Sequence, residues 1–276
     1  MHDPFVGQPY QAARDVHVIP TYWPVPGMGT IAMNAFLLDA AEPVLVDTGV
    51  GVLSDDFLDA LGSLLDPARL RWIWLTHEDR DHTGSLGQLI ELAPRAEVVA
   101  TFLTFGRSAP EAPIPMDRQR MLRPGDVLNV GDRNLRALRP PLFDSPGTLG
   151  FLDDSSGTLL SSDCFGAPLD FQSAVSGDAD AVDPDQLHHA QVAWATADSP
   201  WVTLTAEDRL RGEIEAIRDL QPSGILSSHL PVVRKRVGPS LDSLLAARTA
   251  DPQPAPTQAE LEALLAEFAP AEPARD

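Results

Sequence analysis

The sequence predicts an α/β fold, and three observations support that prediction. Apolar strands alternate with helical patterns, as where the buried strand expected at residues 71–75, RWIWL, is followed by a helix beginning near Gly84. Side chains of the kinds that bind metal ions follow that strand directly, in the type of connection where α/β folds place their chemistry. The length of 276 residues suffices to bury one large core of this class or two small domains.

The first half of the chain contains further strand and helix patterns. Residues 31–38 and 44–46 are predicted to be adjacent strands, followed by a helix that Ser54 would cap. The helix after the buried strand has one apolar face and is expected to end at Pro94. Residues 97–100 are predicted to form another strand. This alternation of strand and helix is what the fold class requires.

The second half begins with a predicted hairpin. Residues 149–154 and 158–162 would form its strands, joined through Ser-Ser-Gly. Asp144 precedes the hairpin and Asp163 follows it, so both carboxylates would reach the same end of a sheet. Residues 166–184 are rich in Gly, Ala, Asp and Pro, and they are predicted to form a long loop or lid over that end.

Two helices are predicted after this loop. Residues 185–197 include His188 and His189, whose side chains would point about 100° apart on a helix, so neither is expected to bind a metal ion. The next helix, at residues 205–220, would be capped by Thr205 and would bury one apolar face.

The most informative segment is residues 76–84, THEDRDHTG. It places His77, Asp79, Asp81 and His82 within six residues at the end of an apolar strand. Alternate side chains of an extended segment share a face, so the first three can converge while the following turn adds the fourth. Such a concentration of carboxylates is unfavourable unless cations neutralise it. One loop could thereby serve two metal ions, and the alternative is a solvated acidic loop.

This segment resembles the metal-binding loop of the metallo-β-lactamase superfamily, Thr-His-x-His-x-Asp-His-x-Gly after a buried strand, with Asp79 in place of the second histidine. Residues 43–49, PVLVDTG, resemble the superfamily strand whose aspartate, here Asp47, accepts hydrogen bonds behind the metal ligands. Residues 159–166 resemble the strand that delivers a metal-bridging aspartate, and residues 225–231 the strand that supplies the last histidine. The resemblance implies an αββα sandwich, in which two β-sheets are flanked by helices.

Within the superfamily, the closest resemblance is to the diiron core of flavodiiron proteins and their flavodoxin-free oxygen-binding relatives. Those proteins use His-x-Glu-x-Asp-His, so a carboxylate at the position of Asp79 is characteristic of them. The side chain of Asp79 is one methylene shorter than their glutamate. The third histidine of the family appears in this chain as Asp144, before a Pro-Gly turn. Without this resemblance, the sequence would predict only that the carboxylate of Asp144 caps the N–H groups of that turn.

The resemblance also implies a ligand set for two metal ions. Metal one would be bound by His77, Asp79 and Asp144, metal two by Asp81, His82 and His229, and Asp163 would bridge them. Oxygen-rich ligation favours iron, with manganese or zinc as alternatives.

The activity implied is that of a non-haem diiron oxidoreductase, which binds or reduces dioxygen or nitric oxide or uses oxygen in redox chemistry. Two alternatives stay open. One is a hydrolase in which a metal-bridging hydroxide attacks an ester, lactone, thioester or phosphoester. The other is a non-catalytic oxygen or metal sensor. The chain has no glycine-rich motif for a flavin or nucleotide, so a separate electron-transfer protein is the expected partner of a redox centre.

Residues 1–250 are expected to form one metallo-β-lactamase-like domain. Residues 251–276 would add a Pro-rich linker and a short amphipathic helix, opened by a capping box at Thr257. The apolar stripe of that helix consists of Leu261, Leu264, Leu265 and Phe268. The favoured interpretation is that the stripe packs back on the core, and the alternative is a partner-binding helix.

Composition excludes some classes of partner. A net charge of −20 disfavours nucleic acid, because binding to phosphates draws its affinity from Lys and Arg. The N-terminus lacks a positive, apolar signal sequence, and no stretch approaches a membrane span. We therefore expect a cytoplasmic protein that acts on a small-molecule substrate or a diatomic gas, without nucleic acid or membrane as a partner. Assembly as a homodimer is compatible with the sequence.

Overall fold

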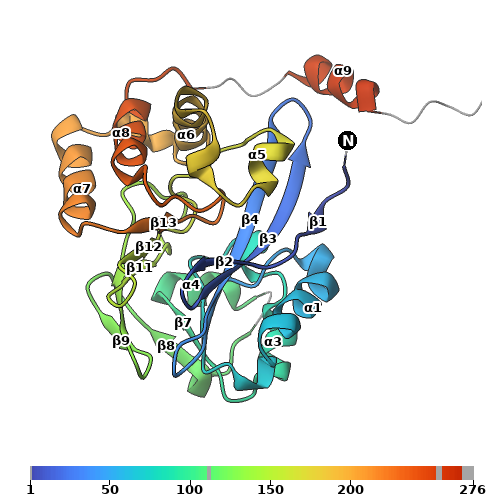
Figure 1. Ribbon diagram of the computed structural model, residues 1–276, viewed down its shortest axis with the longest axis vertical. Helices are drawn as coiled ribbons and strands as arrows, with labels where there is room; N and C mark the ends of the chain where they lie inside the picture. Colours follow the sequence, from blue (N-terminus) through green and yellow to red (C-terminus); the bar gives the residue numbers. More distant parts are fainter. Residues whose placement is uncertain (1, 111–112, 253–256, 269–276) are drawn as a thin grey trace, which may run out of the picture.

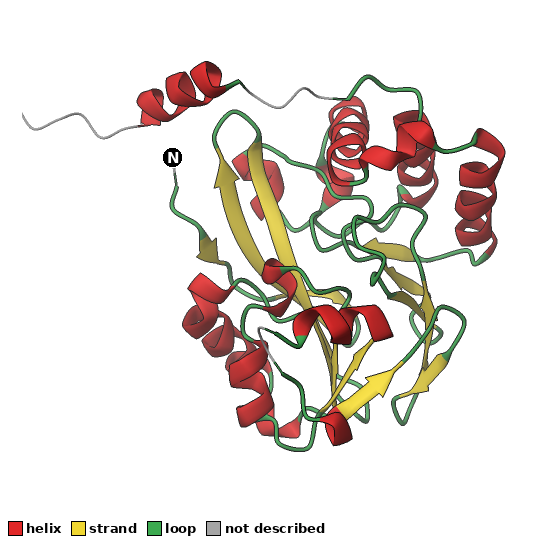
Figure 2. Cartoon of the chain, turned by 180° about the vertical axis from the view of Figure 1, so that it is seen from behind, coloured by secondary structure: helices red, strands yellow, loops and turns green. Residues whose placement is uncertain are grey.

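Two β-sheets pack face to face between two layers of helices in the computed structural model, which describes residues 2–110, 113–252 and 257–268 (Figure 1). Figure 2 shows the same layers from behind, with the helices lying outside the strands. The αββα sandwich predicted from the sequence is confirmed.

The first sheet is built from the N-terminal half of the chain. Its strands are β1 (Phe5–Val6), β2 (Tyr10–Ala13), β3 (Val16–Val25), β4 (Gly29–Leu38), β5 (Val44–Val46), β6 (Trp72–Trp74), β7 (Glu97–Ala100) and β8 (Gln119–Met121). They lie in the order β1-β3-β4-β5-β6-β7-β8, with β2 beside β3. Strands β5 to β8 are parallel, whereas β3 and β4 form a long antiparallel hairpin. The predicted strands in this half correspond to β4, β5, β6 and β7.

The second sheet follows from the C-terminal half. Its strands are β9 (Val127–Asn129), β10 (Asn134–Leu138), β11 (Gly150–Asp153), β12 (Thr158–Leu160) and β13 (Gly224–Leu226). The order is β13-β12-β11-β10-β9, and β12 and β13 pair in parallel. Strands β11 and β12 form the predicted antiparallel hairpin. Because β12 and β13 run in the same direction, the residues that follow them emerge at one end of the sheet.

Helices cover the outer faces of both sheets. The α-helices are α1 (Ser54–Leu64), α2 (Arg80–Thr83), α3 (Leu86–Leu92), α4 (Phe102–Ser108), α5 (Phe171–Val175), α6 (Pro184–Asp198), α7 (Glu207–Asp219), α8 (Val237–Ala247) and α9 (Gln258–Phe268). Short 3-10 turns are η1 (Gly51–Leu53), η2 (Pro67–Arg69), η3 (Met116–Arg118), η4 (Ala179–Ala181) and η5 (Pro200–Leu204). Helices α1 and α3 pack on the first sheet, and α6, α7 and α8 pack around the second.

Strand β6 shows how the sequence specifies this layering. It is apolar at every position because both faces of the first sheet are covered. Ile73 faces the helices with Leu61, whereas Trp74 faces the second sheet. There the indole N–H of Trp74 donates to the carbonyl of Leu149 at 2.8 Å, and its ring packs edge-on against Phe151 at 4.7 Å between centroids. The strand that precedes the ligand loop is therefore fixed from both sides.

Two helix caps predicted from the sequence are wrong. Ser54 is the first residue of α1 rather than its cap, and its hydroxyl donates to the carbonyl of Gly51 at 2.9 Å. The hydroxyl of Thr205 donates to the carbonyl of Trp201 at 3.2 Å instead of capping α7. In both cases a 3-10 turn, η1 or η5, precedes the helix, and one of its carbonyls accepts a hydrogen bond from the hydroxyl.

The segment at residues 166–184 is not the structureless loop that was expected. It contains α5 and η4, and the carboxylate of Asp170 caps α5 by accepting from the backbone N–H of Ser173 at 3.0 Å. The backbone N–H of Thr30 on β4 donates to the carbonyl of Leu169 at 2.7 Å, which ties the segment to the first sheet. Aspartate side chains at helix starts explain why a Gly- and Pro-rich stretch still forms helical turns.

Helix α9 has the predicted capping box, because Thr257 and Glu260 exchange hydrogen bonds between side chain and backbone. Its predicted packing on the core is wrong for the described side chains. Leu261 and Leu265 are 38% and 51% exposed, and Leu264 lies against Gly27 at the tip of the β3–β4 hairpin (Figure 1). The side chain of Phe268 and the Pro-rich residues 253–256 lie outside the described residues. Among the described helices, none is long and apolar enough to cross a bilayer.

Candidate metal centre

The metal-binding residues predicted from the sequence come together at one end of the sandwich. His77, Asp79, Asp81 and His82 follow β6, Asp163 follows β12, His229 follows β13, and Asp144 lies in the turn before β11. Ligand atoms within 4.8 Å of one another form three groups of these residues: His77, His82 and Asp163; Asp81, His82 and His229; and His77, Asp79 and Asp144. The seven side chains predicted from the sequence therefore lie together in the structure.

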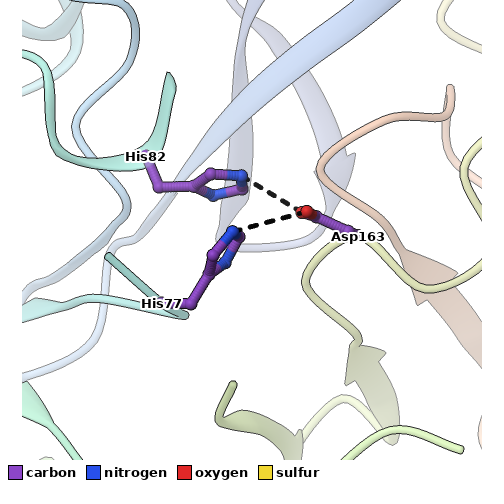
Figure 3. Close-up of side chains that lie close together, drawn as sticks. All are labelled: His77, His82 and Asp163. Atoms are coloured by element: carbon purple, nitrogen blue, oxygen red, sulfur yellow. Dashed lines mark ion pairs between the residues drawn. The ribbon is translucent and has the colours of Figure 1, made fainter. Parts of the chain in front are cut away.

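Figure 3 shows the rings of His77 and His82 next to each other, both facing the carboxylate of Asp163. One carboxylate oxygen, Oδ1, lies 3.1 Å from Nε2 of His82 and 3.2 Å from Nε2 of His229. The other, Oδ2, lies 3.4 Å from Nε2 of His77. Each oxygen thus faces a different set of imidazoles, as a carboxylate that bridges two cations would.

The atoms that face the centre lack hydrogen-bond partners. Nε2 of His77, Nε2 of His82 and Oδ1 of Asp163 are buried and make no hydrogen bond. Buried polar atoms are nearly always satisfied, and a deficit of about 1–3 kcal/mol accompanies each one that is not. Imidazole nitrogens with a carboxylate between them are ligands of divalent metal ions. The residues present therefore fit the metal pair that the sequence predicts.

Asp47 holds the ligand loop from behind, as the resemblance implied. Its Oδ1 accepts from the backbone N–H of Thr76, and its Oδ2 accepts from the Thr76 hydroxyl and from Nδ1 of His82, all at 2.8 Å. Asp47 and Thr76 are buried. A proton held on Nδ1 leaves Nε2 of His82 free to face Asp163.

The other two histidines are oriented in the same way. Nδ1 of His229 donates to the carbonyl of Ala32 at 2.8 Å, and Nδ1 of His77 lies 3.2 Å from the hydroxyl of Ser162. In each case the contact at Nδ1 directs Nε2 into the centre. Two histidines of the loop after β6 and one that follows β13 are thereby aimed at one point.

Asp79 and Asp144 border the site on its open side. Their Oδ2 atoms lie 3.9 Å and 3.7 Å from Nε2 of His77, and their side chains are 54% and 23% exposed. Oδ1 of Asp144 accepts from the backbone N–H of Ser145 at 2.6 Å. Asp144 therefore makes the turn contact expected of an isolated Asp-Ser-Pro-Gly sequence and also faces the centre with its second oxygen.

The charged side chains of the centre strongly shift one another's pKa values. Burial alone would lower the pKa of His82, but the carboxylates of Asp81 and Asp163 outweigh it and hold that pKa well above its usual value. Burial likewise lowers the pKa of His229, and Asp163 outweighs it, giving a pKa of about 9. Burial would raise the pKa of Asp163, but His77 and His82 hold it well below its usual value. Cations at this point are stabilised by the surrounding carboxylates.

Two acidic residues at the site were not predicted. Asp198 ends α6, and one of its oxygens groups with those of Asp144 and Asp163 within 4.8 Å. Burial, followed by repulsion from those carboxylates, raises the pKa of Asp198 to about 7. Glu78 faces away from the centre, where its Oε1 accepts hydrogen bonds from the guanidinium of Arg107 at 2.6 Å and from the hydroxyl of Ser145 at 2.8 Å. Asp198 belongs to no motif, and Glu78 occupies a variable position of the motif at residues 76–84, so neither contact could be predicted from the motifs.

Close packing fixes the path of the ligand loop. A Cβ atom at Gly84 would lie 2.1 Å from the backbone nitrogen of Gly51 and 2.5 Å from the carbonyl oxygen of Gly49. The backbone N–H of Gly84 donates to that carbonyl at 2.9 Å. Glycine is required at this position because two backbone segments meet there.

A cavity of about 350 Å³ opens onto the centre. Asp79, Asp81, Asp144, Asp163, Asp198 and His229 line its polar floor, together with Arg80. Its walls are largely apolar, formed by Trp23, Ile31, Met33, Val50 and Trp194. A water molecule occupies about 30 Å³ in the liquid, so the cavity is large compared with a diatomic gas.

Comparison with known proteins yields one family and a consistent set of relatives. A family model described as "ODP family beta lactamase" matches residues 31–229. Diflavin flavoprotein A 1 from Synechocystis sp. is 27% identical over 207 residues, which cover 74% of this chain and 34% of that protein. The chain therefore spans about a third of the length of this curated relative.

Solved structures share the fold. The rubredoxin oxygen:oxidoreductase of the anaerobe Desulfovibrio gigas superposes with a TM-score of 0.74 at 18% identity, over 87% of this chain and 61% of that one. A flavo di-iron protein from Thermotoga maritima, solved as a histidine-to-asparagine variant, gives 0.76 at 17% identity, over 92% of this chain and 64% of that one. At these identities the likeness supports the arrangement of sheets and helices alone.

Proposed function

The chain belongs to the ODP family of beta-lactamase-fold proteins, and from that premise we propose that it binds two metal ions, with iron as the first choice. His77, Asp79 and Asp144 would bind one ion, Asp81, His82 and His229 the other, and Asp163 would bridge them. Manganese would suit the same oxygen-rich donor set, and zinc would suit it less well.

One observation carries this proposal more than any other. The buried, unpartnered Nε2 atoms of His77 and His82 face different oxygens of Asp163, Oδ2 at 3.4 Å and Oδ1 at 3.1 Å. These contacts are longer than the charge-assisted hydrogen bonds, about 2.7–2.9 Å, that a purely structural ion-pair cluster would form. Donor atoms at this spacing suit cations lying beside the carboxylate.

We propose that the centre reduces dioxygen, with nitric oxide as the second diatomic to test. When bound, an iron pair would supply the electrons and the open coordination position for that reaction. The protein contributes orientation: Asp47 and the carbonyl of Ala32 hold the protons of His82 and His229 on Nδ1, so that Nε2 stays available. The apolar walls that Trp23 and Trp194 contribute to the cavity exclude water from one side of the centre.

Electrons would come from a separate protein or domain. The described residues form one αββα unit and include no second domain for a flavin. A net charge of −20 favours a donor whose docking face is basic, because complementary charge raises encounter rates. A homodimer stays a prediction.

Stopped-flow mixing tests the redox proposal. The iron-loaded, chemically reduced protein is mixed with oxygen, and the absorbance of the centre is followed together with oxygen consumption. We expect a single stoichiometric oxidation that restarts only when a reductant or flavoprotein reductase is added. A reduced, iron-loaded protein that never reacts with oxygen or nitric oxide would contradict the proposal.

The size of the cavity favours a second candidate. A space of about 350 Å³ with apolar walls would hold an organic molecule beside the metal pair. A hydrolase of an ester, lactone, thioester or phosphoester would use that space, and the metal pair held by the proposed ligands would supply the activation of a water molecule as the nucleophile. Sustained ester hydrolysis by the zinc-loaded protein under anaerobic conditions would favour this activity over oxygen reduction.

A further inference from the structure

We propose that Asp198 is an additional ligand of metal one, so that this ion is bound by more carboxylates than metal two. The inference rests on the proposed metal pair and concerns a residue outside every metal-binding motif of the sequence. It predicts that the two sites differ in the metal ions they prefer.

The position of Asp198 supports this role. It is the last residue of α6, and one oxygen of its carboxylate lies within 4.8 Å of oxygens of Asp144 and Asp163. Two donor atoms bound to one ion at about 2.2 Å lie at most about 4.4 Å apart. A small movement of an aspartate side chain is therefore enough to close the three oxygens around an ion.

A separate observation points to an ion at this place. Nε2 of His77 is fully buried without a hydrogen-bond partner, and it lies 3.7 Å from Oδ2 of Asp144 and 3.4 Å from Oδ2 of Asp163. It is thus directed at both of the carboxylates that group with Asp198. Three carboxylates whose oxygens lie within 4.8 Å repel one another, and a cation removes that repulsion.

Tryptophans on both sides of Asp198 fix its position relative to the ligand loops. The indole N–H of Trp194, one turn earlier on α6, donates to the backbone carbonyl of Asp163 at 3.0 Å. The indole N–H of Trp201, on η5, donates to the backbone carbonyl of Phe143 at 2.9 Å, directly before Asp144. The end of α6 is therefore fastened to both loops whose carboxylates it meets.

The resulting donor sets differ. Metal one would have a single imidazole, from His77, with carboxylates from Asp79, Asp144, Asp163 and Asp198. Metal two would have imidazoles from His82 and His229 with carboxylates from Asp81 and Asp163. Hard, oxygen-rich ligation suits Mn²⁺ and oxidised iron, whereas a site with more nitrogen suits Zn²⁺. We expect the affinity for Mn²⁺ relative to that for Zn²⁺ to be higher at metal one than at metal two.

The test compares Asp198→Asn with Asp185→Asn in the full chain. Asparagine keeps an oxygen that can accept from the hydroxyl of Ser199, as Oδ2 of Asp198 does at 3.1 Å. Asp185 is exposed in the first turn of the same helix, so the control changes the net charge equally, far from the site. Circular dichroism and thermal melting of the metal-free proteins check that all variants fold.

Titration of the metal-free proteins with Mn²⁺, followed by electron paramagnetic resonance and elemental analysis, gives the affinity of each site. We expect two ions in the wild type and in Asp185→Asn. In Asp198→Asn, we expect one site unchanged and the other at least tenfold weaker. Two sites of wild-type affinity in a folded Asp198→Asn protein would overturn the inference while leaving the metal pair intact. A wild type that binds no metal ion would instead overturn the proposed function.

A second variant separates ligation from a packing role. Asp198→His offers a nitrogen donor from the same backbone position. We expect the Co²⁺-loaded variant to show visible absorption bands that differ from those of the wild type, because the donor set of one ion changes. Identical Co²⁺ spectra for Asp198→His, Asp198→Asn and wild type would contradict ligation.

Discussion

Replacing Asp47 by asparagine should weaken metal binding although no metal ligand is replaced. In the wild type, Oδ2 of Asp47 accepts from Nδ1 of His82 and from the hydroxyl of Thr76, each at 2.8 Å. In Asp47→Asn, an NH₂ group would take the place of this oxygen. The Thr76 hydroxyl can rotate and accept from it, but a protonated Nδ1 of His82 cannot. The substitution therefore favours the tautomer that carries its proton on Nε2, where a metal ion would bind.

The size of the expected loss in metal affinity follows from the single hydrogen bond that Asp47→Asn removes. A hydrogen bond to a charged group contributes about 1.5–3 kcal/mol. Since 1.4 kcal/mol corresponds to a factor of ten, we expect metal affinity to fall about 10- to 100-fold, which is the usual effect of losing a partner behind a histidine ligand.

Competition with a chromophoric chelator measures this change. Asp39→Asn is the matched control, because Asp39 is exposed at the end of β4 and its replacement changes the net charge equally. We expect the control to bind like the wild type. An Asp47→Asn protein that folds and binds both metal ions within twofold of the wild type would refute the assigned role of Asp47.

Three further predictions address the centre and the core. Asp163→Ala should lower metal occupancy at both sites, whereas Asp144→Ala should weaken binding at only one site. Elemental analysis of both variants checks this. Unchanged metal content and activity in Asp144→Ala would mean that the carboxylate of Asp144 only caps the turn. Metal affinity should fall as pH drops below about 9. Asp163 overcomes the effect of burial and raises the pKa of His229 to about 9, so this ligand must lose a proton before it binds a metal ion. Proton release on metal addition at pH 7 measures this coupling, and its absence would argue against His229 as a ligand. Trp74→Phe should lower the free energy of unfolding by about 1–3 kcal/mol, because the buried carbonyl of Leu149 loses its donor; urea denaturation would contradict this if the midpoint did not move.

The parts of the fold that could be predicted are those whose signal is local. Strand β6 is a continuous apolar run because both sheet faces are covered, and the histidines after it follow a compact motif. Strand β3 escaped prediction because Pro20 and Pro24 lie within it, and prolines argue against a strand interior. The structure tolerates them because β1 and β2 pair with only parts of the other edge of β3.

The residues of the candidate site also divide into those with a local sequence signal and those without one. Asp163 and His229 were predictable because each follows an apolar strand in a recognisable motif. Asp198 was not, because its place at the centre depends on how α6 packs against the second sheet and on indole hydrogen bonds from Trp194 and Trp201. The exposed stripe of α9 was misjudged because an apolar helix face carries no information about what it contacts.

Metal content tests the central claim most directly. The chain would be expressed in medium supplied with iron, manganese and zinc, purified without chelators, and analysed for all three elements per mole of protein. We predict two metal ions per chain, mostly iron or manganese, because Asp79, Asp81, Asp144 and Asp163 offer four carboxylates to the pair. A protein that holds no metal ion, or a single stoichiometric zinc ion, would contradict it.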